Sequence, residues 1–313
     1  MSKVNLSLLV IGGTGFIGRY VVREAIKRGF EVSVFSLNIP KTHERLVQAK
    51  YFSLDIRDIN SLKKVTKNEN FDYVINLGGY INHSKFNKGG RQVIDDHFSS
   101  VLNIIECVNW HGLKSFLQVG SSSEYGDNKS PQNENMIEKP FSPYSLAKSA
   151  ATQTLKMLYL TEDFPSIIVR IFLAYGPGQS DDRFIPQIIK GCFADEEFKT
   201  SEGLNFCDFT YVEDISSGIM DLLVCKAALG EVVNLASGKP VQIKSIVEKI
   251  NKIINKGKPV FGSLDNPINN ENLYADISKA KSLIDWEASI DLDEGLRKTI
   301  TSYDTNFKDK ERS

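Results

Sequence analysis

The sequence predicts an α/β protein built on a doubly wound parallel sheet, with a smaller domain of mixed α/β structure. Three observations predict this fold class. Short apolar runs alternate with helical patterns through the first half of the 313-residue chain. A glycine-rich turn joins the first apolar run to the first helical pattern. After Phe172 the alternation gives way to shorter helices and to loops rich in Gly, Pro and Asp. Alternating strands and helices are typical of a parallel sheet with crossover helices.

The strands are predicted from short apolar runs rich in β-branched and aromatic residues. They are expected at Leu8–Ile11, Glu31–Phe35, Tyr51–Leu54, Tyr73–Leu77, Phe116–Val119 and Ile167–Ile171. Long helical patterns cover Ile94–Trp110 and Tyr144–Leu160. A later run, Glu231–Leu235, is expected to return to the same sheet.

The turn after the first strand carries glycines at Gly12, Gly15 and Gly18. Such glycines allow a tight turn, a close approach of the backbone to a pyrophosphate, and close packing of a helix on a strand. The helix that follows presents free N–H groups and positive dipole charge to phosphates. Because the pattern stands between a strand and a helix, it predicts a dinucleotide site, with a purely structural turn as the alternative.

Composition excludes several classes of function. The chain has 38 basic and 39 acidic residues, so nothing in its charge indicates binding to nucleic acid or to an anionic membrane surface. No apolar run has the length of a membrane span. The sequence passes from Met1 directly into a strand, and the four cysteines are scattered without metal-binding spacing. We therefore expect a cytoplasmic enzyme with free thiols and no metal.

A second motif lies where Ser142 and Pro143 form a typical helix start. The helix places Tyr144 and Lys148 on one face. A lysine ammonium beside a phenol is expected to lower the tyrosine pKa, so that the hydroxyl can exchange a proton near neutral pH. Ser121 leaves a strand at its carboxyl end, where doubly wound sheets bind ligands. Each feature alone has an ordinary structural explanation, but together with the glycine turn they predict a catalytic site.

With these motifs the chain resembles the extended short-chain dehydrogenase/reductases that act on nucleotide sugars. The turn from Gly12 matches the family's GGxGxxG, and Tyr144 and Lys148 match its YxxxK pair. Ser121, five residues before Gly126, stands at the place of the catalytic Ser or Thr. Further matches follow in order at Asp55–Asp58, Asn76–Gly79, Tyr175–Gly178, Asp208–Asp214, Asn234–Gly238 and Ala275–Ala280. The resemblance covers nearly the whole chain.

The resemblance implies an NAD(P)-binding Rossmann domain formed by residues 1–172 and about 212–236. Residues 173–211 and 237–313 would form the nucleotide-sugar domain. Tyr144 would be the acid/base, Lys148 would bond the nicotinamide ribose, and Ser121 would polarise the sugar oxygen. The expected cofactor-binding residues besides Tyr144 and Lys148 are Gly12, Thr14, Gly15, Phe16, Ile17, Gly18, Arg19, Ser36, Asp55, Ile56, Leu77, Gly78 and Gly79. The expected substrate contacts are Ser122, Ser123, Tyr175, Gln179, Arg183 and Phe184, of which the last four could equally be loop and core residues.

Departures from the family pattern limit which of the family's reactions this chain can catalyse. The 4,6-dehydratases carry an acidic residue where this chain has Ser122 and Ser123, and serine cannot abstract the sugar C5 proton. Glu124 comes one residue late, and a shift of one position in an extended segment reverses the direction of a side chain. We therefore expect no dehydratase. Cys207 replaces an arginine that usually grips the diphosphate, and His97 stands where the family has asparagine.

Cofactor preference is predicted from the end of the second strand. A free ribose 2′-hydroxyl is usually bound by an acidic residue there, but this strand ends in Ser36. Arg19 directly follows the last glycine of the turn, and a cation together with a neutral hydroxyl suits a 2′-phosphate. The sequence therefore predicts NADP(H) in preference to NAD(H). The alternative is that Arg19 is a solvated helix residue.

Three functions remain open. The favoured one is reduction of the C4 keto group of a nucleotide-linked 4-keto-6-deoxyhexose (a dTDP, GDP or CDP sugar) for surface polysaccharide, because the segment from Gly120 to Gly126 resembles that of bacterial 4-ketoreductases. The first alternative is a nucleotide-sugar 4-epimerase with tightly bound NAD. The second is a non-catalytic NADP-binding protein on the same fold. Family members commonly pair the helices 94–110 and 144–160 across a dimer interface, so a homodimer is also expected.

Overall fold

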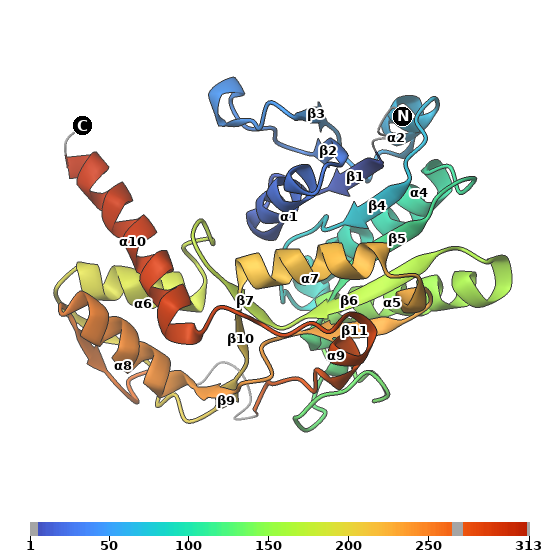
Figure 1. Ribbon diagram of the computed structural model, residues 1–313. Helices are drawn as coiled ribbons and strands as arrows, with labels where there is room; N and C mark the ends of the chain where they lie inside the picture. Colours follow the sequence, from blue (N-terminus) through green and yellow to red (C-terminus); the bar gives the residue numbers. More distant parts are fainter. Residues whose placement is uncertain (1–5, 265–271, 312–313) are drawn as a thin grey trace.

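In the computed structural model, which describes residues 6–264 and 272–311, seven strands form one parallel sheet (Figure 1). Its strands are β1 (Ser7–Ile11), β2 (Glu31–Ser36), β3 (Ala49–Ser53), β4 (Tyr73–Asn76), β5 (Ser115–Ser121), β6 (Ser166–Ile171) and β11 (Val232–Leu235). The order across the sheet is β3-β2-β1-β4-β5-β6-β11. Every predicted strand is confirmed, including the return of Glu231–Leu235, which pairs with β6. The strand order reverses between β1 and β4, and ligands bind at the carboxyl ends beside such a switch point.

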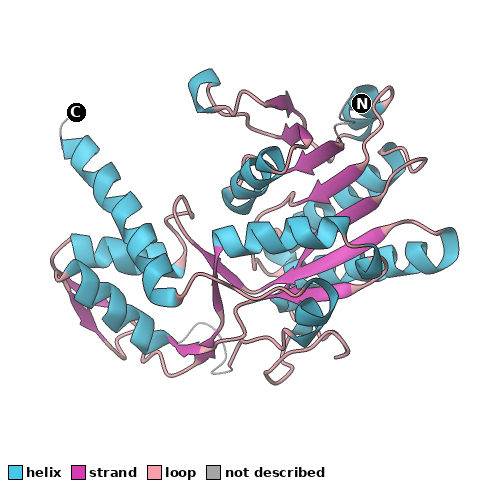
Figure 2. Ribbon diagram, in the orientation of Figure 1, coloured by secondary structure: helices cyan, strands magenta, loops and turns pink. Residues whose placement is uncertain are grey.

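Helices cover both faces of this sheet (Figures 1 and 2). On one face pack α1 (Phe16–Lys27), α7 (Val212–Val224) and α9 (Ser278–Ile284). On the other pack α2 (Ile59–Thr66), α4 (Ser100–Cys107) and α5 (Pro143–Glu162). Burial on both faces explains why the central strands are apolar at nearly every position.

The helix expected at Ile94–Trp110 is divided. It begins as α3 (Gly90–Ile94), continues as a π-helical turn (Asp95–Ser99) and ends as α4. The extra residue of the π turn brings two consecutive polar side chains, Asp96 and His97, into the interior. Asp96 is held there by hydrogen bonds from Tyr80 and Gln92 and by Arg57. Such π turns often occur at functional sites.

Several segments of the second half of the chain form a smaller lobe at the left of Figure 1. Its helices are α6 (Phe184–Phe193), α8 (Ile243–Ile254) and α10 (Leu292–Glu311). Its short strands are β7 (Leu173–Tyr175), β8 (Glu197–Lys199), β9 (Phe206–Cys207), β10 (Phe209–Tyr211), β12 (Val241–Gln242) and β13 (Lys258–Val260). They pair as β7 with β10, β9 with β12, and β8 with β13. These elements share an apolar core separate from those of the main sheet.

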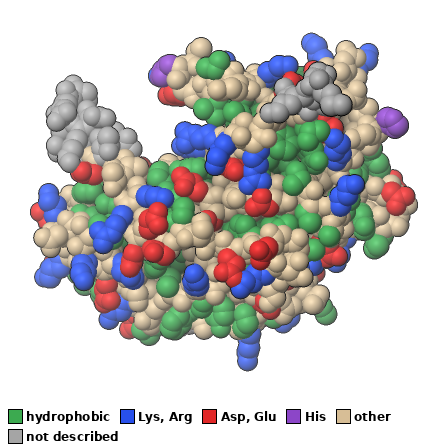
Figure 3. Space-filling view, viewed as in Figure 1, with side chains coloured by type: hydrophobic (Ala, Val, Ile, Leu, Met, Phe, Trp, Pro, Cys, Tyr) green, Lys and Arg blue, Asp and Glu red, His purple; other side chains and the backbone are tan. Residues whose placement is uncertain are grey.

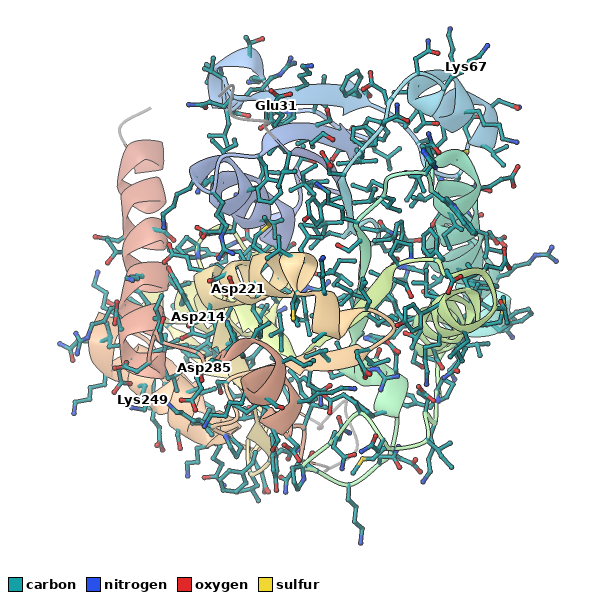
Figure 4. All side chains as sticks on the ribbon, turned by 45° about the vertical axis from the view of Figure 1, so that its right-hand side comes forward. Glu31, Lys67, Asp214, Asp221, Lys249 and Asp285 are labelled. Carbon is teal, nitrogen blue, oxygen red and sulfur yellow. The ribbon has the colours of Figure 1, made fainter. Side chains whose placement is uncertain are left out.

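Two acidic side chains of α7, both labelled in Figure 4, bind other segments of the chain. Asp221 forms an ion pair with Arg28 at the end of α1, with a distance of 2.6 Å between Nη1 and Oδ1. Asp214 accepts hydrogen bonds from the backbone N–H groups of Ser289 and Ile290. The face seen in Figure 3 carries acidic and basic side chains side by side, in keeping with the nearly balanced charge. Among the described residues, no helix is long and apolar enough to cross a membrane.

Candidate active site

The glycine turn after β1 has the geometry that a dinucleotide site requires. Gly12 has a φ of +75°, and a Cβ there would lie 2.9 Å from the carbonyl carbon of Leu77. A Cβ on Gly18 would lie 2.2 Å from the carbonyl oxygen of Gly12, so the packing of α1 on the turn requires glycine. Gly15 precedes α1 without a side-chain cap, and Phe16 and Ile17 begin the helix. The first N–H groups of α1 are therefore available to an anion.

The end of β2 is hydrogen-bonded to the glycine turn. Ser36 is buried, and its hydroxyl lies 3.4 Å from the backbone N–H of Thr14, which donates to it. The Thr14 hydroxyl donates to the carbonyl of Asn38. Arg19, expected to join Ser36 at a 2′-phosphate, instead directs its guanidinium to the second half of the chain, where Nη2 donates to the Gly178 carbonyl at 3.2 Å.

The loops after β3 and β4 supply the other expected cofactor residues. Asp55 is engaged by Arg57, whose Nε and Nη2 donate to it at 2.9 and 2.7 Å, and this bond lowers the Asp55 pKa. After β4, Leu77 donates its N–H to Ile11 on β1, and the Gly78 N–H is bonded to the Asn76 side chain. Ile56 packs beside Gly78, and Gly79 has a φ of +126°. All of these residues lie near the switch point.

The three predicted catalytic residues meet at the carboxyl end of β5. Ser142 caps α5 and Pro143 begins it, which sets Tyr144 and Lys148 on one face. The Ser121 side chain lies close enough to the Tyr144 hydroxyl to lower its pKa. The Lys148 ammonium donates to the Val119 carbonyl at 2.9 Å and lies 6.0 Å from the centre of the Tyr144 ring.

The pKa values of the pair differ from the sequence expectation. Burial raises the pKa of Tyr144 to about 12, and the neighbouring Ser121 side chain opposes this rise. Burial also lowers the pKa of Lys148 to about 8, so its charge is poorly solvated. The expected depression of the tyrosine pKa is therefore wrong for this arrangement, because Lys148 is directed to a carbonyl and desolvation dominates.

The serines and the glutamate after Ser121 have different roles. Ser123 donates its hydroxyl to Ser121 at 2.9 Å, whereas Ser122 is buried. Glu124 is fully buried and accepts hydrogen bonds from the Ser121 N–H, the Thr152 hydroxyl and the Arg170 guanidinium. All of these bonds are 2.8–3.0 Å long. Glu124 therefore fixes the end of β5 to α5 and β6 through these hydrogen bonds.

Three basic residues near the tyrosine were not assigned a catalytic role from the sequence. The rings of His83 and His97 pack edge-on against Tyr144, with centroid distances of 5.5 and 5.0 Å. Burial lowers the pKa of His83, and the positive charge of Arg183 adds to this lowering. The same charge opposes the rise that burial causes in the Tyr144 pKa. The sequence gave no signal for His83. For His97 the only signal was that a histidine stands where the family has asparagine.

The other residues expected to contact substrate are placed differently. Tyr175 is 1% exposed and its ring packs against Phe209 and Tyr211, which favours the alternative that it is a core residue. Gln179 donates to the Ala174 carbonyl, and Phe184 packs against Phe209. Of the four, the structure brings Arg183 to the catalytic residues.

Two further features bear on the ligand. Cys207 is buried in the apolar core of the smaller lobe, and burial raises its pKa to about 11. Its thiol is therefore neutral and cannot replace a phosphate-binding cation. Among the described residues, no group of three or more His, Cys, Asp or Glu side chains is placed to hold a metal ion.

This fold and site define a nicotinamide-dinucleotide enzyme of the extended short-chain dehydrogenase/reductase class. The glycine cradle and the uncapped helix fit a pyrophosphate, and the Tyr144, Lys148 and Ser121 group lies at the same edge of the sheet. The chain belongs to the NAD dependent epimerase/dehydratase family, whose model matches residues 8–236.

Known proteins of this family resemble the chain over its whole length. The UDP-glucuronate 4-epimerase of Thermodesulfobacterium geofontis is 29% identical, over 96% of this chain and 97% of its own length. The structure of a UDP-glucuronic acid 4-epimerase from Bacillus cereus, in complex with UDP-glucuronic acid and NAD, superposes with a TM-score of 0.86 at 23% identity, over 96% of this chain and all of that one. A dTDP-glucose 4,6-dehydratase from Bacillus anthracis in complex with NAD gives a TM-score of 0.84 at 24% identity, over 97% and 98%. The predicted preference for NADP(H) gains no support from these neighbours.

Proposed function

We propose that this chain is a nucleotide-sugar 4-epimerase that uses NAD at C4 of the sugar. The observation that carries the proposal is the grouping of Tyr144, Ser121 and Lys148 at the edge of the sheet where the glycine turn lies. Relatives named as 4-epimerases favour this function over the 4-ketoreductase that the sequence alone favoured.

The residues of the chain would divide the work as follows. A bound nicotinamide would take up a hydride from the sugar carbon and return it to the opposite face. Tyr144 would take the proton of the C4 hydroxyl and give it back, while Ser121 would bond the same sugar oxygen. Lys148 would hold the nicotinamide ribose and so keep the nicotinamide beside Tyr144.

Dehydration is a poor fit because it needs a carboxylate free to abstract the C5 proton. Glu124 spends its two oxygens on Ser121, Thr152 and Arg170. Its carboxylate is fully buried beneath the strand end. We therefore propose that Glu124 positions Ser121 and takes no proton from substrate.

We also propose the substrate side of this site. Residues 173–211 and 237–313 would hold the nucleotide sugar, and the remaining chain up to residue 236 would hold the dinucleotide. Arg183 would bond an anionic group of the substrate, either the diphosphate or an acidic sugar substituent, because its charge already reaches Tyr144. Ser123 would contact the sugar next to Ser121.

A 4-ketoreductase using NADP(H) is the second candidate. It is favoured by the neutral Ser36 at the end of β2, where a carboxylate would repel a 2′-phosphate. Arg19 would have to leave the Gly178 carbonyl to reach that phosphate. A silent NADP-binding protein is disfavoured by the intact catalytic group.

Assembly and location complete the proposal. Helix α5 exposes Leu146, Met157 and Leu160 on one face, and α4 exposes Leu102. Exposed apolar residues at helical spacing are typical of a helix that packs against a partner. We propose that two copies pair α4 and α5 in a homodimer, in the cytoplasm.

One experiment separates the candidate functions. One portion of the purified protein is denatured to release and identify any bound nicotinamide. A second, native portion is tested with UDP-glucose, UDP-glucuronate and nucleotide-linked 4-keto-6-deoxy sugars. An epimerase forms the C4 epimer without net change in NADH absorbance. A reductase consumes one NADPH for each keto-sugar reduced. Protein that binds NAD but turns over none of these sugars would contradict both functions.

A further inference from the structure

His97 is the buried polar group that the proposed chemistry leaves unused. It lies in the π-helical turn, is 2% exposed, and packs its ring at 87° to that of Tyr144. Within the described part of the chain, its Nδ1 has no hydrogen-bond partner. A buried polar atom without a partner costs about 1–3 kcal/mol, and native proteins contain few of them. This atom therefore calls for an explanation.

The hydrogen bond at the other ring nitrogen identifies Nδ1 as a donor. The backbone N–H of Tyr80 donates to Nε2 at 3.5 Å, so Nε2 acts as an acceptor. Burial, and the nearby charge of Lys148, lower the pKa of His97 to about 4, so the ring is neutral at physiological pH. A neutral imidazole that accepts at Nε2 carries its proton on Nδ1. The unpartnered atom is thus an N–H group that requires an acceptor.

The surroundings of Nδ1 indicate which ligand supplies that acceptor. A Cβ on Gly79 would lie 2.5 Å from Nδ1, so only a glycine lets the loop after β4 approach this edge of the ring. Tyr144 packs on the same ring, and the charge of Lys148 reaches it. Lys148 has donors only, so it cannot satisfy an N–H group. A hydroxyl oxygen has two lone pairs and can accept from both His97 and Lys148.

We propose that His97 donates its Nδ1–H to a ribose hydroxyl at the nicotinamide end of the bound dinucleotide, which Lys148 also bonds. His97 is then a positioning residue that fixes the nicotinamide beside Tyr144. The inference rests on the proposed function only in that the chain binds NAD. It predicts that the histidine contributes to affinity for the half of the cofactor that contains nicotinamide and not for the adenine half.

The binding test compares NAD with ADP, which lacks the nicotinamide ribose. His97→Phe keeps a planar ring and removes the donor, and His97→Asn restores an N–H donor on a shorter side chain. We expect His97→Phe to weaken NAD binding about three- to tenfold by isothermal titration and to leave ADP binding unchanged. His97→Asn is expected to recover part of the loss. His43→Phe, at an exposed histidine, is the matched control and should change neither.

Equal affinity of wild type and His97→Phe for NAD would overturn the inference. Equal loss of NAD and ADP affinity, with a lower melting temperature, would also overturn it, because it would show a purely structural role. A wild-type protein that binds NAD but turns over no nucleotide sugar would contradict the proposed function and leave this inference standing.

The tautomer gives a second, independent test. The chain has four histidines, so the signals of ¹⁵N-labelled imidazoles can be assigned by substitution. We expect His97 to be neutral at pH 7 with its proton on Nδ1, and its Nδ1 signal to shift when NAD is added. A proton on Nε2 would overturn the inference.

Discussion

Replacing Lys148 by methionine should stabilise the protein while it removes activity. The lysine is 7% exposed, and burial lowers its pKa from 10.5 to about 8. That difference corresponds to about 3 kcal/mol of unfavourable free energy for carrying the charge in the folded state. Loss of the hydrogen bond to the Val119 carbonyl offsets about 1 kcal/mol. Lys148→Met should therefore raise the free energy of unfolding by about 2 kcal/mol at neutral pH.

The pH dependence of this gain follows from the same pKa. Below pH 8 the lysine is charged in both the folded and the unfolded chain, so the full cost of burial is present. Between pH 8 and 10.5 the folded protein loses this proton first, the unfolded chain binds more protons, and wild-type stability rises with pH. Above pH 10.5 the cost is gone. The advantage of Lys148→Met over wild type should therefore shrink through this window.

Urea unfolding of both proteins at several pH values measures this difference directly. Lys64→Met, at an exposed lysine of α2, controls for the change of side chain and should show no such pH-dependent gain. A Lys148→Met variant that is less stable than wild type at pH 7, or whose advantage does not change with pH, would refute the assignment of a buried, poorly solvated ammonium. Turnover by Lys148→Met at the wild-type rate would refute its place in the catalytic group.

Four further changes test other parts of the site and surface. Tyr144→Phe should reduce kcat about 100- to 10,000-fold with NAD affinity unchanged by titration, because only the proton donor is lost. Glu124→Gln should lower the melting temperature by about 3–6 °C, since it breaks a buried ion pair and opposes two donors; an unchanged melting temperature would deny its structural role. Ser36→Asp should weaken NADP binding at least about tenfold and spare NAD, through repulsion of the 2′-phosphate. Met157→Glu should give monomers by light scattering if α5 pairs two copies, and a wild-type monomer would exclude that pairing.

Local sequence was enough to predict the sheet and the glycine turn. β-branched runs such as Ile167–Ile171 are buried on both faces, so their composition alone defines them as strands. Gly12 and Gly18 meet backbone atoms, and no other residue type would fit, so the spacing of the glycines carries the geometry. The helix cap at Ser142 is also a local signal, and it sets the start of α5 and thereby the face that carries Tyr144 and Lys148.

Features that depend on distant partners were not predictable in this way. The π turn exists where Asp96 receives bonds from Tyr80 and Arg57, which lie on other elements. Tyr175 belongs to a matched motif, but the motif does not indicate that its ring lies in the apolar core of the smaller lobe. The pKa of Tyr144 depends on burial and on the direction of the Lys148 side chain, which spacing along a helix does not fix.

Glu124 shows how one buried residue links the fold to the choice of reaction. Arg170 is a fully buried arginine in the otherwise mostly apolar strand β6, and its charge requires a buried anion. Glu124 supplies that anion with an N–O distance of 3.0 Å, and Glu138 supplies a second at 2.6 Å. Because one oxygen of Glu124 also fixes the Ser121 N–H, a carboxylate released to abstract a sugar proton would leave both the strand end and the arginine unsupported. The position of this glutamate, one residue after the serines, therefore favours hydride and proton exchange at a single carbon over loss of water.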